Sequence, residues 1–121
     1  MALNKILHKG KTIYFNDWTN LKNPKDFAPK IEEGNSNTKF LIGLDKKDVL
    51  TLTDVTGSFT FGETIQWIKD AAKLAKPITK KSATVGLSTS KKILLNSLNS
   101  FTKSEVKAFD TIEEAKDWLV L

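Results

Sequence analysis

The sequence contains no cysteine and no arginine, and it has one histidine and one tyrosine. The lack of cysteine excludes disulfides, thiol nucleophiles and cysteine-ligated metal centres. The single histidine, His8, provides no cluster from which a metal site is usually built. We therefore expect neither a metal nor a cofactor, and we predict no catalytic residue. His8 itself is expected to be an exposed residue of a turn.

All 19 basic residues are lysines, and with 14 acidic residues they give a net charge of +5. Arginine is the residue that usually makes bidentate contacts to phosphate and guanine. The lysines are also interleaved with acidic residues along the whole chain. This pattern indicates a solvated surface and argues against specific nucleic-acid binding.

Long apolar runs are also missing. The longest, "FLIGL" and "WLVL", are far shorter than the ~20 residues that a membrane span needs. The amino-terminal "MALNKILHKG" lacks the apolar region of a signal peptide. A chain of 121 residues suits one domain with a core of its own. We expect a single cytoplasmic domain over residues 1–121.

The first half of the sequence predicts a hairpin followed by a helix. In "KILHKGKTIYF" two β-type runs flank a turn in which Gly10 can adopt a positive φ. Asn23 can cap a helix over 23–44, with Pro24 at its first position. Pro29 and Gly34 leave the continuity of this helix open. Its expected buried stripe consists of Phe27, Ile31, Gly34, Thr38 and Leu41.

In the second half, strands alternate with helices. The predicted elements are a strand over 48–54, a helix from the cap Thr60 to residue 75, a strand over 82–87, a helix over 88–101, a strand over 105–109, and a helix over 111–121 capped by Asp110 with Glu113. The order ββαβαβαβα predicts an α/β fold with a mixed sheet of about five strands and four helices.

The predicted strands alternate apolar residues with threonine, glycine or lysine. A parallel sheet that is covered on both faces should instead show continuous apolar runs. We therefore expect the helices to lie mainly on one face of the sheet. The other face would be open and would contact a protein partner, or a second copy in a homodimer. Its candidate contact residues are Tyr14, Thr51, Thr53 and Thr84.

Ligands of parallel sheets tend to bind beyond the carboxyl ends of the strands. In "LSTSKK", hydroxyls and free backbone N–H groups at a helix start precede two lysines, which suits an anion; alternatively, Ser88 or Ser90 only caps the helix. Asp54 is either a general base or phosphoacceptor, or it bonds amides of its own turn. The candidate ligand or anion contacts are Ser88, Thr89, Ser90, Lys91, Lys92, Asp54 and Thr56.

Four stretches resemble the SpoIIAA-like family: "ILHKGKTIYFNDW", "VLTLTDVTG", "KKSATVGLSTSKKILLNSL" and "FDTIEEAKDWLV". These small bacterial proteins have a fold similar to STAS domains and are sometimes grouped with the lipid-binding Sec14-like fold. The resemblance covers nearly the whole chain and implies a STAS-like domain.

The best-known STAS members switch through a phosphorylated serine in an Asp-Ser-Ser-Gly motif. Here Asp54-Val55-Thr56-Gly57 resembles the segment upstream of that motif, and Thr64 stands at the position of the phosphoserine. The serines are missing, and Glu63 brings a fixed negative charge. The resemblance thus implies a non-catalytic regulatory or protein-interaction module. The alternative is a protein that binds a small molecule, an anion or a lipid, in a pocket at the strand-to-helix turns or between the helices and the sheet.

Overall fold

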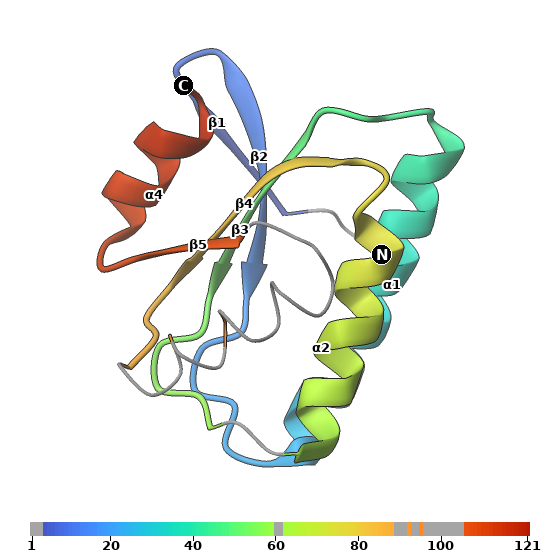
Figure 1. Cartoon of the computed structure of the whole chain (residues 1–121), viewed down its shortest axis with the longest axis vertical. Helices are drawn as coiled ribbons and strands as arrows, with labels where there is room; N and C mark the ends of the chain where they lie inside the picture. Colours follow the sequence, from blue (N-terminus) through green and yellow to red (C-terminus); the bar gives the residue numbers. More distant parts are fainter. Residues whose placement is uncertain (1–3, 60–61, 89–91, 93–94, 96–105) are drawn as a thin grey trace.

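The computed structural model describes residues 4–59, 62–88, 92, 95 and 106–121 (Figure 1). Its elements are β1 (Lys5–His8), β2 (Lys11–Asp17), α1 (Pro24–Gly43), β3 (Val49–Asp54), α2 (Gly62–Ala75), β4 (Thr79–Val85), β5 (Val106–Phe109) and α4 (Ile112–Leu119). The predicted α/β fold is confirmed, with three helices in this part of the chain. Most of the helix expected over 88–101 lies outside the described residues. Within them, no helix has the length and apolarity needed to cross a membrane.

The five strands form one mixed sheet in the order β1-β2-β3-β4-β5. β1 pairs antiparallel with β2, and the remaining neighbours pair in parallel. In the hairpin turn Lys9 has φ 49° and Gly10 has φ 80°. Two consecutive positive φ values are those of a type I′ turn, whose twist matches that of the flanking strands. The predicted hairpin and mixed sheet are therefore confirmed.

Helix α1 runs without interruption through Pro29 and Gly34. At its start the Asp26 carboxylate accepts hydrogen bonds from the backbone N–H groups of Lys22 and Asn23, both at 3.1 Å. Pro29 removes one backbone donor from the helix. Burial of Phe27, Ile31 and Leu41, the apolar residues of the predicted stripe, holds the helix in place despite this loss.

One face of the sheet is apolar and is covered by α4. Its buried core consists of Ile13, Leu50, Leu52, Ala83 and Val85 from the strands with Ala115 and Leu119 from α4. The cap of α4 lies one residue later than predicted. The Thr111 hydroxyl oxygen accepts from Glu114 N–H at 3.2 Å and donates to the Glu114 carboxylate at 3.0 Å. Thr111 thus takes the role expected of Asp110, and Glu114 that of Glu113, because Thr111 is the last extended residue before the helix.

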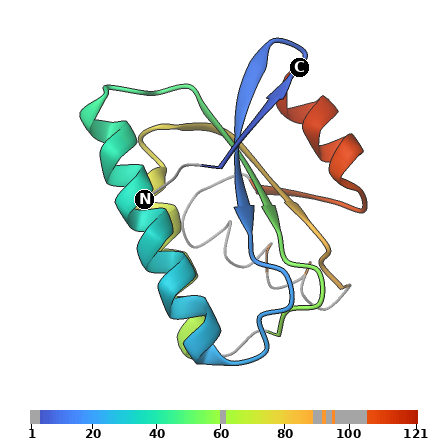
Figure 2. The same ribbon diagram turned by 180° about the vertical axis from the view of Figure 1, so that it is seen from behind.

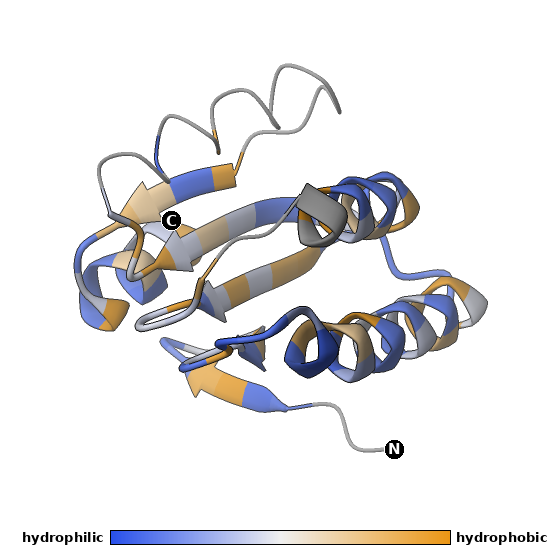
Figure 3. Ribbon diagram, turned by 90° about the horizontal axis from the view of Figure 1, so that it is seen from below, coloured by the Kyte–Doolittle hydropathy of each residue, from blue (hydrophilic) through white to orange (hydrophobic). Residues whose placement is uncertain are grey.

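Helices α1 and α2 run alongside each other on the opposite side of the sheet (Figure 1 and Figure 2). Seen along the layers, the sheet lies between this pair and α4 (Figure 3). The expectation that helices leave one face of the sheet open is therefore wrong. Alternation of apolar and polar residues along a strand usually indicates that one face of the sheet is exposed to solvent. Here the polar positions lie beneath α1 and α2 instead. Tyr14, Thr51, Thr53 and Thr84 line a cavity beneath these helices.

Lys81 of β4 fastens the carboxyl end of α4 to the sheet. Its ammonium group donates to the backbone oxygens of Trp118 at 3.1 Å and of Leu121 at 3.4 Å. It also lies 4.9 Å from the centre of the Trp118 ring. The last carbonyls of a helix lack intrahelical partners and carry partial negative charge, so a lysine there is favourable.

Two residues at the hairpin turn also contact α4. His8 Nε2 lies 2.7 Å from the Asp117 carboxylate, and Lys9 Nζ lies 3.2 Å from the same oxygen. The His8 side chain is only 17% exposed. His8 is therefore a contact between β1 and α4 and not the exposed turn residue that we expected.

Replacing Lys81 with methionine should lower the free energy of unfolding by about 1–2 kcal/mol, since it removes charged hydrogen bonds to the end of α4 and a cation–π contact. Urea unfolding followed by circular dichroism measures this change. Lys80→Met on the same strand is the matched control, because Lys80 is exposed. Equal effects of the two substitutions would contradict this role of Lys81.

Candidate functional site

Two Asp-x-Thr turns follow β2 and β3. One Asp17 carboxylate oxygen accepts from Thr19 N–H at 3.1 Å and from the Thr19 hydroxyl at 2.6 Å. Asp54 accepts in the same way from Thr56, at 3.0 Å and 2.6 Å. Asp17 and Asp54 are partners in the sheet register, so the two turns lie side by side. Asp54 and Thr56, predicted as ligand contacts, therefore bond each other, as the turn alternative for Asp54 expects. A role of Asp54 as ligand contact, general base or phosphoacceptor stays a prediction.

The parallel pairing continues into these turns and connects the loops before α1 and α2. Backbone hydrogen bonds of 2.9 Å join Asn20 N–H to the Thr56 carbonyl and Val55 N–H to the Val85 carbonyl. The buried Ser58 adds a side-chain link, since its hydroxyl accepts from Leu21 N–H at 2.9 Å and donates to the Trp18 carbonyl. The starts of the two helices are thereby held in fixed positions above the sheet.

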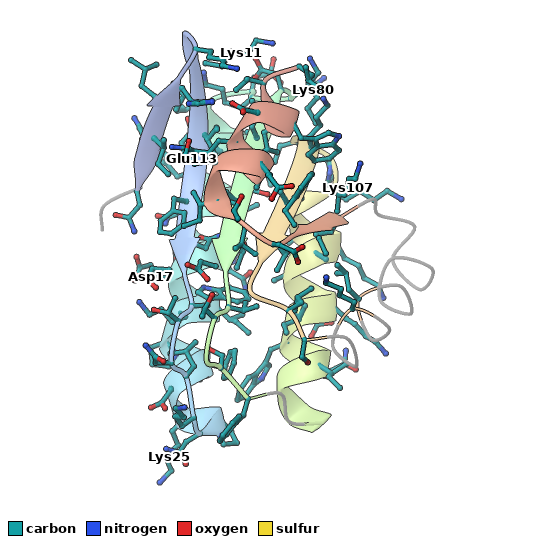
Figure 4. The ribbon with its side chains drawn as sticks, turned by 90° about the vertical axis from the view of Figure 1, so that its left-hand side faces the viewer. Lys11, Asp17, Lys25, Lys80, Lys107 and Glu113 are labelled. Carbon is teal, nitrogen blue, oxygen red and sulfur yellow. The ribbon has the colours of Figure 1, made fainter. Side chains whose placement is uncertain are left out.

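Asp17 lies at the end of β2, and the chain then runs on to Lys25 at the start of α1 (Figure 4). The two hydrogen bonds from Thr19 hold the pKa of Asp17 below its ordinary value. The positive charge of Lys30 acts in the same direction, while partial desolvation opposes it. The lowered pKa follows from the turn and does not by itself indicate a catalytic acid.

The predicted anion site is only partly described. Lys92 N–H donates to the Ser88 carbonyl at 2.9 Å, which corresponds to one helical turn. The Lys92 ammonium group lies 3.3 Å from the Asp110 carboxylate, so its charge faces an acid. Thr89, Ser90 and Lys91 lie outside the described residues, and the anion site stays a prediction.

The position predicted for a phosphoserine equivalent, Thr64, falls in the first turn of α2, where the structure describes only the backbone. The described ranges also hold no group of three or more histidine, aspartate or glutamate side chains that could bind a metal ion. Neither finding tests the predicted equivalence of Thr64 to the phosphoserine position.

A cavity of about 270 Å³, partly open to solvent, lies between the sheet and the helix pair α1–α2. On its helix side the lining residues are mostly small or aliphatic. Ala71, Ala72 and Ala75 come from α2, and Gly34 comes from the middle of α1. A Cβ atom added at Gly34 would meet no heavy atom within 4 Å. These short side chains do not reach the sheet, and this leaves the volume unfilled.

The sheet side of the cavity is polar but uncharged. Two rows of register partners cross β2, β3 and β4, one formed by Tyr14, Thr51 and Ser82 and the other by Asn16, Thr53 and Thr84. All six residues line the cavity. We call these six residues the polar floor.

Two hydrogen bonds lie within the polar floor. The hydroxyls of Thr51 and Ser82 are 2.6 Å apart, and the Asn16 amide donates to the Thr53 hydroxyl at 3.3 Å. Among the described residues, the phenol of Tyr14 and the hydroxyl of Thr84 make no side-chain hydrogen bond. The floor therefore offers a guest molecule two groups that can both donate and accept.

Charged side chains are absent from the described lining of the cavity. Charged residues line a small neighbouring pocket of about 30 Å³ between β2 and α1, which includes Asp17, Lys30 and Glu33. This pocket shares Asn16, Gly34 and other lining residues with the cavity. The cavity thus has an uncharged interior beside a polar edge that carries both signs of charge.

Comparison with solved structures identifies one architecture. A crystal structure of an uncharacterized protein from the DUF3478 family with a SpoIIAA-like fold, from Shewanella loihica PV-4, superposes with a TM-score of 0.74. The match covers 98% of this chain and 92% of that chain, at 17% sequence identity. The chain has a SpoIIAA-like fold. The resemblance drawn from the sequence is confirmed at this level, which concerns the fold and not an activity.

Comparison by sequence adds nothing to this fold assignment, since no protein-family model and no curated protein matches the chain.

Four residues of the polar floor, Tyr14, Thr51, Thr53 and Thr84, were predicted from the sequence but were assigned to an open surface. Sequence reasoning missed Asn16, Ser82 and the role of Gly34 as a gap in the helix wall. A cavity could have been inferred from two features of the sequence. Hydroxyl residues occupy alternate positions of β3 and β4, and three alanines lie on one side of α2. Sequence reasoning also missed that "DWTN" repeats the pattern of "DVTG", which places two equal turns at one end of the sheet.

Gly86→Ala should destabilise the fold far more than Gly10→Ala, although both glycines have positive φ, at 92° and 80°. At Gly86 a Cβ atom would lie 2.7 Å from the Thr56 backbone nitrogen, whereas at Gly10 it would meet nothing within 4 Å. We expect a loss of about 1 kcal/mol at Gly10 from backbone strain alone. At Gly86 the loss should be at least about 3 kcal/mol, measured by chemical denaturation. Similar losses of stability in the two variants would mean that the loop at Gly86 is not packed against Thr56.

Thr19→Val should raise the pKa of Asp17 towards its ordinary value by removing the hydroxyl donor. Because the native pKa is lowered, the stabilisation by ionised Asp17 is present above about pH 4 and is lost as the pH falls through the native value. The carboxyl carbon chemical shift of Asp17, followed by NMR from pH 7 to 2, reports the pKa directly. An unchanged titration in the variant would show that the Thr19 hydroxyl has no influence.

Proposed function

We propose that this protein binds a small, uncharged and mostly apolar molecule in the cavity between the sheet and helices α1 and α2. The observation that carries the proposal is a volume of about 270 Å³ with no charged side chain in its described lining. Ligand sites in proteins are typically cavities of this kind, apolar for the most part with a few placed polar groups. We further propose that the role is binding and not catalysis.

The volume sets the size of the ligand. An engineered apolar cavity of about 150 Å³ accommodates benzene. By simple scaling, about 270 Å³ has room for roughly ten or eleven non-hydrogen atoms. This is far fewer than a membrane phospholipid contains, so a whole lipid is not favoured.

The lining sets the charge of the ligand. A buried ion without a paired charge is strongly disfavoured. The described walls present hydroxyls, amides and alkyl groups, but no lysine. An anion is therefore not favoured in this cavity. The protein-partner hypothesis loses the open sheet face as a contact surface and keeps the strand-to-helix turns.

Gly34→Leu should abolish binding, because its side chain would extend into the open space beside Gly34 and fill part of the cavity. The guest to be used is para-propyltoluene, an uncharged compound of about the expected size. Binding is measured from chemical shift changes of the Ile31 and Ile68 methyl groups, which lie at the cavity wall. We expect saturable changes in the native protein and none in the variant.

The matched control is Gly43→Leu. Gly43 is the last residue of the same helix, lies outside the cavity and has equally free space for a side chain. It should bind like the native protein. Loss of binding in both variants would point to a general effect on α1, and no binding in the native protein would refute the proposed function for this class of guest. Mass spectrometry of the natively purified protein then tests for a co-purified molecule.

A further inference from the structure

The polar floor stands on a face of the sheet that α1 and α2 cover. Covered faces of parallel strands are usually continuous runs of valine, isoleucine and leucine. Here six positions in two adjacent rows are hydroxyl or amide residues, and all six line the cavity. All six residues are half-buried, so water or a guest molecule can reach them. The floor differs from the facing part of α2, whose alanines offer only alkyl surface, while α1 adds Asn35, Asn37 and Thr38 to the lining.

Four of the six residues of the polar floor form side-chain hydrogen bonds with each other, and two do not. Thr51 pairs with Ser82, and Asn16 pairs with Thr53. Tyr14 and Thr84 stand at opposite corners of the two rows, and their oxygens have no side-chain partner within the described part of the chain. The Tyr14 residue is half-buried against Leu41, Val49 and Ile78, so its ring is held in place at one end of the cavity.

From this arrangement we infer the chemical class of the ligand: a neutral molecule with an apolar body and a hydroxyl or carbonyl group that bonds the Tyr14 or Thr84 hydroxyl. The apolar body lies against the alanines of α2. The inference rests on the proposed function, because it specifies which molecules the same cavity selects. A hydroxyl can donate or accept, so both alcohols and carbonyl compounds satisfy the floor.

The test compares two guests of nearly equal size, para-propylphenol and para-propyltoluene, which differ by a hydroxyl in place of a methyl group. Transfer from water into an apolar site favours the toluene, since the phenol must give up hydrogen bonds to water. A preference for the phenol therefore requires hydrogen bonds from the protein. We expect the native protein to bind the phenol about three- to tenfold more tightly, measured by methyl chemical shift titration.

The double variant Tyr14→Phe with Thr84→Val should remove this preference while still binding the toluene. Both substitutions delete an oxygen that has no described side-chain partner and keep the shape of the side chain. The single variants show which corner bonds the guest. Thr12→Val is the control, because Thr12 lies on β2, is exposed and does not line the cavity.

The outcomes separate the two proposals. Loss of the preference in the double variant but not in Thr12→Val supports the inferred ligand class. Equal binding of both guests by the native protein, or a preference that survives in the double variant, overturns that class and leaves the proposed cavity binding intact. If neither guest shifts the methyl signals of the native protein, the proposed function fails as well.

Discussion

The alternation of side chains along the central strands gives the two faces of the sheet opposite chemistry. In β3, Leu50 and Leu52 point to one face and Thr51 and Thr53 to the other, because successive residues of a strand alternate. The leucine face packs closely against α4, where Ala115 is fully buried and lets the helix approach. The threonine face meets α1 and α2 across a cavity. One face can therefore supply most of the packed core while the other accommodates a guest.

The turns at the carboxyl ends of β2 and β3 keep this cavity in shape. Asp17 and Asp54 each close a tight turn, and Gly86 allows the loop after β4 to pass directly against Thr56. Ser58 then joins the loop before α2 to the loop before α1. Helices α1 and α2 and the polar floor are thereby set relative to each other by hydrogen bonds of the Asp17, Asp54 and Ser58 side chains, which is the preorganisation that a small ligand site requires.

The order of the elements, the hairpin and the first helix could be predicted because they depend on local signals such as the turn glycine Gly10 and the cap at Asn23. Which face of the sheet each helix covers could not be predicted, because the alternation along a strand is the same whether its polar face meets solvent or a cavity. The order of the strands in the sheet decides which face the helices cover. With β2, β3 and β4 adjacent in sequence order, right-handed crossovers place α1 and α2 on one face. No crossover constrains α4, which follows the last strand and is free to cover the apolar face around Leu52.

The walls of the cavity differ in what they offer to water. At the polar floor water can bond Tyr14 and Thr84, whereas the alanine side chains of α2 have no group that bonds it. A guest with one polar group and an apolar body satisfies both walls at once. The unequal walls are therefore better explained by an amphipathic ligand than by solvent alone.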